Sequence, residues 1–489
     1  MKLNRQLIIA LTLFGTIIIG GVVVWSILHV FDIPIDFLFP TLAILGIVSY
    51  LLVFRIDWLM YLLAFSTPFS IVLESDKIQL GISLPAELLM LLVTFLFFCR
   101  ICYDLSLRRE LIRHPISIAI YTYLGWMLFT CFTSELPLVS FKFFAAKIWF
   151  ITSSYWMVIQ LIDKDIKKWM IFFDCYAVAL AIVVAITTFR YVQNGFDKNM
   201  AHWIMAPFYN DHTAYGAVLS LFIPIMFGRL LLPKESISSK IFHTVLLILF
   251  LIGLYLSFSR AAWLGLVGAF VVYIIIKLKI SFKWLTICFV IVGALLWGFS
   301  NEIIYSLSRN NQDSSTQFMQ HLQSISNIST DASNVERINR WQAAFGMIAE
   351  RPIVGWGPGT YQFCYAPFQD YRYQTIISTN FGNRGNAHSE FIGPCAESGI
   401  IGLLTVLFLL ITVIYSGLKI YHTNPESHIR ILALSATLAL LTYYIHGIMN
   451  NFLDTDKLSL PFWGLFALIV VLDTQQNSLK FKSNDLKIK

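Results

Sequence analysis

The sequence Asn386-Ala387-His388-Ser389-Glu390 is followed by Glu397-Ser398-Gly399-Ile400-Ile401-Gly402 at the start of a long apolar segment. This stretch marks the point where a large polar loop enters a membrane helix. The imidazole of His388 is a candidate proton acceptor there, because the unperturbed pKa of histidine lies near neutral pH. Gly399 and Gly402 are expected to let another backbone come close, because glycine has no side chain.

The composition of the whole chain is that of a membrane protein. Of its 489 residues, 57% are hydrophobic and 13% are charged, and the mean hydropathy is +0.71. Soluble domains carry about 25% charged residues. The net charge of +7 does not predict a nucleic-acid partner, because lysine and arginine gather in short connections between apolar segments. We therefore predict an all-α polytopic membrane protein that contacts phospholipid and no nucleic acid.

About fourteen apolar segments predict 12–14 transmembrane helices and one large, partly helical outer loop. The expected organisation is a transmembrane bundle over 1–300, a loop domain over 301–389, C-terminal transmembrane helices over 390–475 and a tail over 476–489. The segments lie at roughly 7–30, 37–54, 58–73, 84–103, 116–133, 139–162, 169–189, 213–228, 241–259, 261–276, 284–300, 390–418, 431–449 and 459–474. Segment 58–73 is short, so it either crosses the membrane or re-enters on the same side.

The charge pattern predicts the orientation of the bundle. Lysine and arginine fall in every second connection, and such connections face the cytoplasm in membrane proteins. Both termini are then cytoplasmic. The remaining connections face outward, including 190–212, the turn at 260, 301–389 and 450–458.

The outer loop 301–389 contains six arginines and no lysine. Guanidinium binds phosphate oxygens through a fixed fork of donors, so this bias indicates an anionic, phosphate-bearing ligand. Within the loop, 334–349 is predicted to be an amphipathic helix, which carries Glu336, Arg337, Arg340 and Trp341. Six acidic residues in the same loop are alternative partners, and we assign half of the arginines to structural ion pairs.

Two further cations lie at predicted outer boundaries. Arg260 ends Ser257-Phe258-Ser259-Arg260 between two closely linked spans, where a charge needs a partner or water. It either reaches lipid headgroups or holds a substrate phosphate. Lys147, like Lys142, lies in the outer half of a span and either contributes to an anion site or extends to the membrane surface.

Other polar residues have plausible structural roles. Asn210-Asp211-His212 leads into a span and is typical of a capped helix start. Asp174, Glu87 and His446 lie in or near spans, where hydrogen bonds between helices are expected. Cys99 and Cys102 form an isolated C-x2-C pair, and there is no H-x-x-x-H motif. We expect no metal and no other cofactor.

Four local patterns resemble the O-antigen ligase family of membrane glycosyltransferases. His388-Ser389 with Gly399 and Gly402 fits the family pattern H-[NSQ]-x9-G-x2-G, and Ser257–Ala262 is similar to its S-x-S-R-(G/A) turn. Glu336-Arg337 with Trp341, followed by Pro352–Gly359, resembles its E-R-x-x-x-W and P-x-x-G-x-G-x-G stretch. Asn210–Ala214 resembles its asparagine-containing helix entry. The similarity covers about 200–415, whereas the N-terminal third matches only in hydropathy and number of spans.

The resemblance implies a multi-pass protein of the bacterial inner membrane with a periplasmic active site. The donor would be a glycan on undecaprenyl diphosphate, and the enzyme a metal-independent, inverting glycosyltransferase. His388 would deprotonate the acceptor hydroxyl. Arg260 and Arg337, with Arg340 and Lys147, would bind the donor diphosphate. Asn210, His212, Glu336, Trp341 and Ser389 are candidates for positioning donor or acceptor.

The acceptor distinguishes the enzymes of this family. An enzyme of this family that uses lipid A–core as its acceptor is an O-antigen ligase, and this is the interpretation we favour. A polysaccharide polymerase uses a growing glycan as its acceptor, and a protein O-oligosaccharyltransferase uses a protein hydroxyl. A lipid-glycan transporter is the non-enzymatic alternative, but it would be expected to place charges along a path at the membrane midplane.

Overall fold

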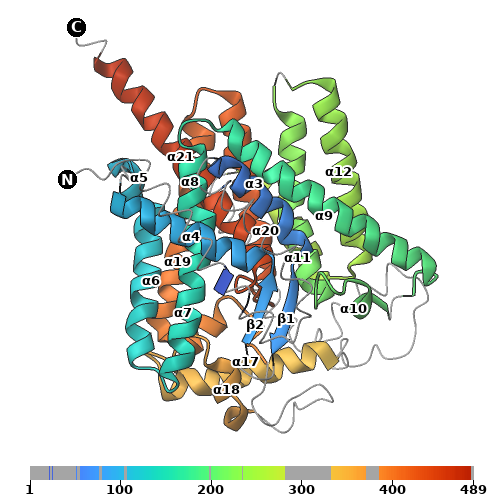
Figure 1. Cartoon of the computed structure of the whole chain (residues 1–489), viewed down its shortest axis with the longest axis vertical. Coiled ribbons are helices and arrows are strands. Elements are labelled where there is room, and N and C mark those ends of the chain that lie inside the picture. Colours follow the sequence, from blue (N-terminus) through green and yellow to red (C-terminus); the bar gives the residue numbers. More distant parts are fainter. Residues whose placement is uncertain are drawn as a thin grey trace.

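A computed structural model describes most of the chain as a helical bundle (Figure 1). Most of the predicted spans 7–30 and 37–54, and all of 284–300 and 301–331, lie outside the described residues. The described residues are 21–22, 25, 51, 55–75, 80–103, 107–197, 200–233, 235–280, 332–369 and 385–485.

Within these ranges, eight helices are long and apolar enough to cross a membrane. They confirm the prediction of an all-α polytopic membrane protein. Their bounds are α6 (Pro115–Phe132), α9 (Lys167–Gln193), α11 (His212–Leu231), α12 (Ile237–Leu256), α13 (Arg260–Lys277), α19 (Ile392–Thr423), α20 (Ser427–His446) and α21 (Asp456–Asp485). In α21 the part that qualifies as a span is Asp456–Gln476.

Predicted span 139–162 is helical, but a π-helical turn divides it. α7 (Pro137–Ile151) continues through η3 (Thr152–Trp156) into α8 (Met157–Ile162). The side chain of Ser153 donates hydrogen bonds to the carbonyl oxygens of Trp149 and Phe150 in this region. Such hydroxyl bonding helps a helix to absorb an irregular turn inside a membrane.

Segment 58–73 does not form one continuous helix. α3 (Ile56–Ser66) ends in a 3-10 turn, η2 (Thr67–Phe69), and the chain then enters an antiparallel hairpin of β1 (Ile71–Ser75) and β2 (Leu80–Leu84). Pro68 supports the turn because its ring fixes φ. The hairpin was not predicted from the sequence, since its strands continue the apolar composition of their neighbours; α4 (Ala86–Tyr103) follows it.

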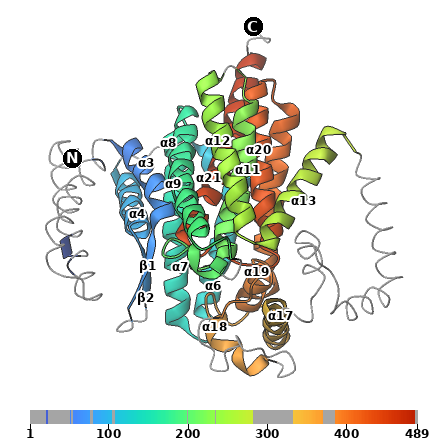
Figure 2. The ribbon, with the colours of Figure 1, turned by 90° about the vertical axis from the view of Figure 1, so that its right-hand side faces the viewer.

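α21 is the central helix of the bundle. Within its span, 94% of residues are buried, against 22% for α13, which lies at the periphery and tilts away from the other helices (Figure 2). Trp169 of α9 donates from Nε1 to the carbonyl oxygen of Gly464, and Tyr176 donates to that of Lys457. These bonds give buried polar side chains partners inside the bundle.

Predicted outer and cytoplasmic connections gather at opposite ends of the described bundle. α17 (Ala332–Glu350) and α18 (Tyr361–Cys364) lie at one end, which we call the site end, and the C-terminus lies at the other (Figure 2). At the site end, the amide of Glu135 donates to the carbonyl oxygen of Trp356. The alternation of charge is thus reproduced for the described helices, and which end faces the periplasm stays a prediction.

Buried ion pairs tie helices together toward the far end. Arg229 of α11 pairs with Asp174 of α9 at 3.1 Å, and His243 of α12 lies 3.2 Å from the same carboxylate. This confirms the expectation that Asp174 makes contacts between helices. Asp473 of α21 is similarly held by His114 and Lys419 at 3.1 and 3.0 Å.

The glycine-rich turn after α17 docks into a break in α19. Gly399 has φ 71° and ψ −175°, and a Cβ there would collide with the carbonyl oxygen of Ile353. The turn is fixed by bonds from the amide of Trp356 to Ala396 O and from that of Gly357 to Glu397 O. The prediction of a close backbone approach is therefore confirmed at Gly399. At Gly402 it is wrong, because the nearest atoms belong to the preceding turn of α19 itself.

Candidate active site

His388 lies on a short loop held in place on both sides. The Oδ1 atom of Asn386 accepts from the amide of His388 at 3.1 Å, and His388 itself has a φ of 46°, in the left-handed region. The buried hydroxyl of Ser389 accepts from the amides of Phe391 and Ile392, each at 3.3 Å, and so caps the start of α19. The loop therefore presents the imidazole from a fixed backbone.

The surroundings of His388 keep its imidazole neutral. Burial lowers its pKa to about 4, and the positive charges of Arg337 and Arg340 act in the same direction. Asp211 and Glu336 oppose the shift, but more weakly. At neutral pH the ring therefore has a lone pair available to accept a proton.

Arg337 connects α17 to the connection between α20 and α21. Its Nε donates to the carbonyl oxygen of Met449 at 3.3 Å, and its Nη2 lies 3.5 Å from Oδ1 of Asn450. These two contacts hold the guanidinium beside the connection between α20 and α21. Because Arg337 also acts on the pKa of His388, this cation lies close to the candidate base.

Arg340 has a different environment on the same helix. It is buried, donates to Glu336 at 2.6 Å and lies 4.2 Å from the ring centroid of Tyr365. Tyr361 also donates to its backbone carbonyl oxygen at 2.7 Å. Arg340 and Glu336 therefore form a structural pair that supports the His388 loop. The neighbouring Trp341 has a buried indole N–H for which the described residues provide no acceptor.

The predicted Asn210-Asp211-His212 and Ser257–Arg260 motifs meet in space. His212 donates from Nδ1 to the carbonyl oxygen of Ser257 at 2.8 Å, while Asp211 caps α11 by accepting from the amide of Thr213 at 2.8 Å. A Cβ at Gly216 would lie only 2.7 Å from that of Ser259, so α11 and the start of α13 are in close contact. This places Arg260 at the site end. Asn210 is exposed.

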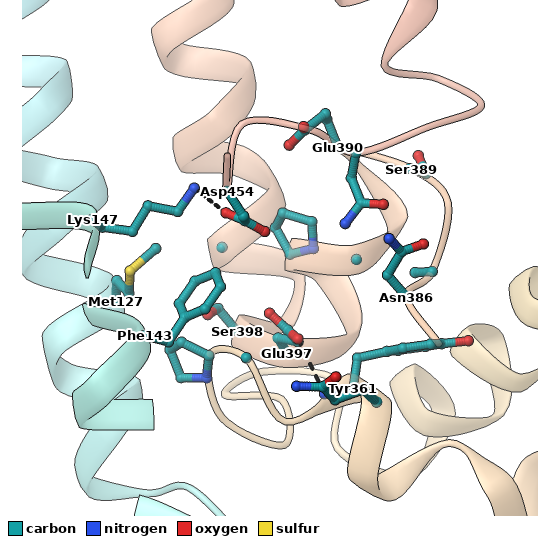
Figure 3. Close-up of a pocket in the computed structure, with 18 of the residues that line it drawn as sticks. Met127, Phe143, Lys147, Tyr361, Asn386, Ser389, Glu390, Glu397, Ser398 and Asp454 are labelled. Carbon is teal, nitrogen blue, oxygen red and sulfur yellow. Dashed lines mark hydrogen bonds and ion pairs between the residues drawn. The ribbon is translucent and has the colours of Figure 1, made fainter. Parts of the chain in front are cut away.

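Lys147 belongs to a separate cluster. It is buried, forms an ion pair with Asp454 and donates to the carbonyl oxygen of Leu453 at 3.4 Å. It therefore does not extend to the membrane surface, as one of our two interpretations had it. The pair lines a cavity of about 380 Å³ between α6, α7 and α19 (Figure 3). A role for Lys147 in diphosphate binding stays a prediction.

The hydrogen bonds of Glu390 at this end were not predicted from the sequence. Glu390 accepts from Tyr443 and from the amides of Phe452 and Leu453, both at 2.9 Å. His446 was expected to hydrogen-bond to another helix, and this is wrong within the described residues: it is fully buried and neither ring nitrogen has a partner. No local pattern marks the bonds of Glu390, because its partners are 53–63 positions away in the sequence.

The described residues contain no group of three or more His, Cys, Asp or Glu side chains that could hold a metal ion. The reactive groups near His388 are instead its neutral imidazole and the neighbouring guanidinium groups. Such groups can accept a proton and stabilise developing negative charge on a phosphate.

Comparison with known proteins identifies part of the chain. Residues 245–409 match a family model described as O-antigen ligase. The match includes Arg260, Arg337 and His388, whereas Lys147 and the 210–212 motif lie outside it. An uncharacterized protein of Haemophilus influenzae is 21% identical over 196 residues, which is 39% of this chain and 47% of that protein. The chain thus spans about half the length of that relative. Over 245–409, about a third of its length, the chain is thus similar to the O-antigen ligase family.

Proposed function

We propose that the protein is a glycosyltransferase of the bacterial inner membrane that acts at its periplasmic face. It moves a glycan from undecaprenyl diphosphate to an acceptor hydroxyl, and the acceptor we favour is lipid A–core. The match to the O-antigen ligase family supports an enzyme of the ligase and polymerase type. The donor, the acceptor and the inverting mechanism are part of the proposal.

In this mechanism His388 accepts the proton of the acceptor hydroxyl. The oxygen attacks the anomeric carbon from the face opposite the diphosphate, so the carbon–oxygen bond to phosphate breaks and the configuration inverts. Arg337 and Arg260 stabilise the charge on the departing undecaprenyl diphosphate, a role that guanidinium fulfils without a metal. The proton on His388 then passes to solvent or to the leaving group.

The observation that carries the proposal is the environment of His388. A general base must be neutral to accept a proton, and burial and nearby positive charge keep His388 neutral while they also lower its basicity. The charge that lowers its pKa comes first from Arg337, the residue that the mechanism assigns to the diphosphate. One cluster thus supplies both the base and the anion site.

We assign Arg340 and Glu336 a supporting role, because they pair with each other and pack on Tyr365. His446 is a candidate contact for the glycan donor substrate, because its ring nitrogens lack protein hydrogen-bond partners within the described residues. Asn210, His212, Trp341 and Ser389 would position the loops that surround the substrate. Of these, His212 and Ser389 already hold backbone atoms of the site.

The decisive experiment analyses surface glycans of a strain that lacks this protein, with and without a plasmid that carries it. Full-length glycan that accumulates on the lipid carrier and is absent from lipid A–core supports the ligase. A single repeat unit on lipid A–core would instead identify a polymerase, and loss of glycan from protein would identify a protein transferase. Unchanged glycans in all three pools would contradict the proposal.

A further inference from the structure

The His388 loop borders two features of different chemistry. The charges of Arg337 and Arg340 on α17 act on His388. The neighbouring loop residues Asn386 and Ser389, but not His388, line the cavity of about 380 Å³ (Figure 3). Two substrates that meet at one base would need separate sites of this kind.

The charged groups of the cavity make it unsuitable for an anion. Three carboxyl groups line it, those of Glu390, Glu397 and Asp454, against one cation, Lys147, which is already paired with Asp454. Burial and the charge of Asp454 both raise the pKa of Glu390. A phosphate would meet these carboxyl groups at a high electrostatic cost, whereas a hydroxyl or amine would find hydrogen-bond acceptors.

The rest of the lining is typical of carbohydrate recognition. Aromatic rings of Tyr123, Trp126, Phe143 and Tyr361 surround the space, and the amides of Gln362 and Asn451 are added to the carboxyl groups. The Oδ1 atom of Asn451 is buried and has no hydrogen-bond donor among the described residues. A few well-placed polar groups among aromatic side chains fix the orientation of a small ligand.

We propose that this cavity binds an uncharged or amine-bearing sugar of the acceptor glycan, in line with its lining. The inference rests on the proposed function, and it locates the acceptor sugar in the cavity that Asn386 and Ser389 of the His388 loop line. The hydroxyl to be glycosylated would approach the base along Asn386 and Ser389, which line the cavity next to it.

Gly393 offers a steric test that removes no polar group. It lines the cavity, and a Cβ at this position would meet only Ala387, at 3.6 Å, which is an ordinary contact. Gly393→Ala should therefore fold, and it serves as the size-matched comparison for Gly393→Met. Gly393→Met extends a flexible chain into the space and should raise the acceptor KM at least tenfold, with the donor KM unchanged.

Binding is also measured without turnover, by saturation-transfer NMR of the acceptor saccharide with purified protein in nanodiscs. We expect a signal for the wild type, Gly393→Ala and His388→Ala, and its loss for Gly393→Met. Gln362→Ala, at the cavity wall, should weaken the signal and serves as the second variant if Gly393→Met does not fold. Glu350→Gln, an exposed change outside the cavity, is the control.

Equal saccharide signals from Gly393→Met and Gly393→Ala, with Gln362→Ala also unchanged, would overturn the proposal. So would a cavity that binds a phosphorylated sugar in preference to its neutral form. The proposed function is tested separately, because it fails when His388→Ala retains transfer, whatever the saccharide signal shows.

Discussion

At the scale of single residues, the site depends on how neighbouring charges set the properties of one side chain. His388 is neutral because burial and two arginines disfavour its protonated form. The arginines differ in turn: Arg340 is paired with Glu336, whereas Arg337 donates to the carbonyl oxygen of Met449 and lies near Asn450. Identical side chains on one helix therefore receive different roles.

Replacement of the base should nearly abolish transfer. We expect His388→Ala to lower the transfer rate by about 10²–10⁴, the usual contribution of a general base. The rate is measured with purified protein in a donor-to-acceptor assay, alongside expression level and monodispersity. His428→Ala, a partly exposed histidine at the far end of the bundle, is the control. Transfer by His388→Ala at the wild-type rate would exclude the catalytic role.

The arginines should not be replaceable by lysine. Lysine keeps the charge but lacks the fork of donors that holds two phosphate oxygens. We expect Arg260→Lys and Arg337→Lys each to lose most of their transfer activity in the same assay. The control is Arg430→Lys, an exposed change at the far end. Full activity in both site variants would mean that positive charge alone is sufficient.

The dependence of transfer on pH follows from the lowered pKa of His388. The neutral form is present above the pKa and is lost as the pH falls through it, so kcat/KM should decline near pH 4 rather than near 6.5. Arg337→Gln removes a charge that lowers this pKa, and its residual activity should therefore decline at a higher pH. The measurement is kcat/KM against pH for both proteins. Coincident acidic limbs would show that Arg337 does not act on the base.

At the scale of elements, the site depends on the break in α19. The left-handed φ of Gly399 lets the turn of Gly355 and Gly357 hydrogen-bond to the helix, and this turn leads directly into α18. The amide of Tyr361 at the start of α18 then donates to Glu397 at 3.1 Å. The break thus attaches the turn after α17 to α19, the helix that begins just after His388 in the sequence.

A side chain at Gly399 should therefore destabilise the site end. A left-handed backbone costs roughly 1–2 kcal/mol for most residues, and the collision with Ile353 adds to this. We expect Gly399→Ala to lower the midpoint of thermal unfolding and to reduce transfer. Gly125→Ala is the matched control, because that α6 glycine has open space around its Cβ position. Equal midpoints for the two variants would contradict this account.

At the scale of the whole molecule, periodicity and charge predicted most of the described bundle. Among the described residues, most of the hydropathy spans, the alternation of their connections and the helix that carries Arg337 have counterparts in the structure. The hairpin at Ile71–Leu84 was missed because its apolar strands resemble a short span. The Lys147–Asp454 pair and the cavity were missed because they depend on contacts between residues far apart in the sequence.

The proposed mechanism also predicts how the transfer activity of the whole enzyme responds to chelators. If guanidinium groups stabilise the leaving diphosphate, transfer by the purified enzyme should be unchanged by EDTA. A metal-dependent enzyme would lose its Lewis acid and fall to background. The assay compares rates before and after dialysis against EDTA. Loss of activity that Mg²⁺ or Mn²⁺ restores would require carboxylates to converge on a metal, and the mechanism would have to be abandoned.

The ion pair between Arg229 and Asp174 has a consequence for how the protein is made. A lone carboxylate or guanidinium is costly in lipid. Asp174 in α9 is synthesised 55 residues before Arg229 in α11. α9 therefore gains from remaining beside the insertion machinery until α11 has emerged. Biogenesis would then favour the release of these helices into the bilayer as a pair, with His243 of α12 completing the set.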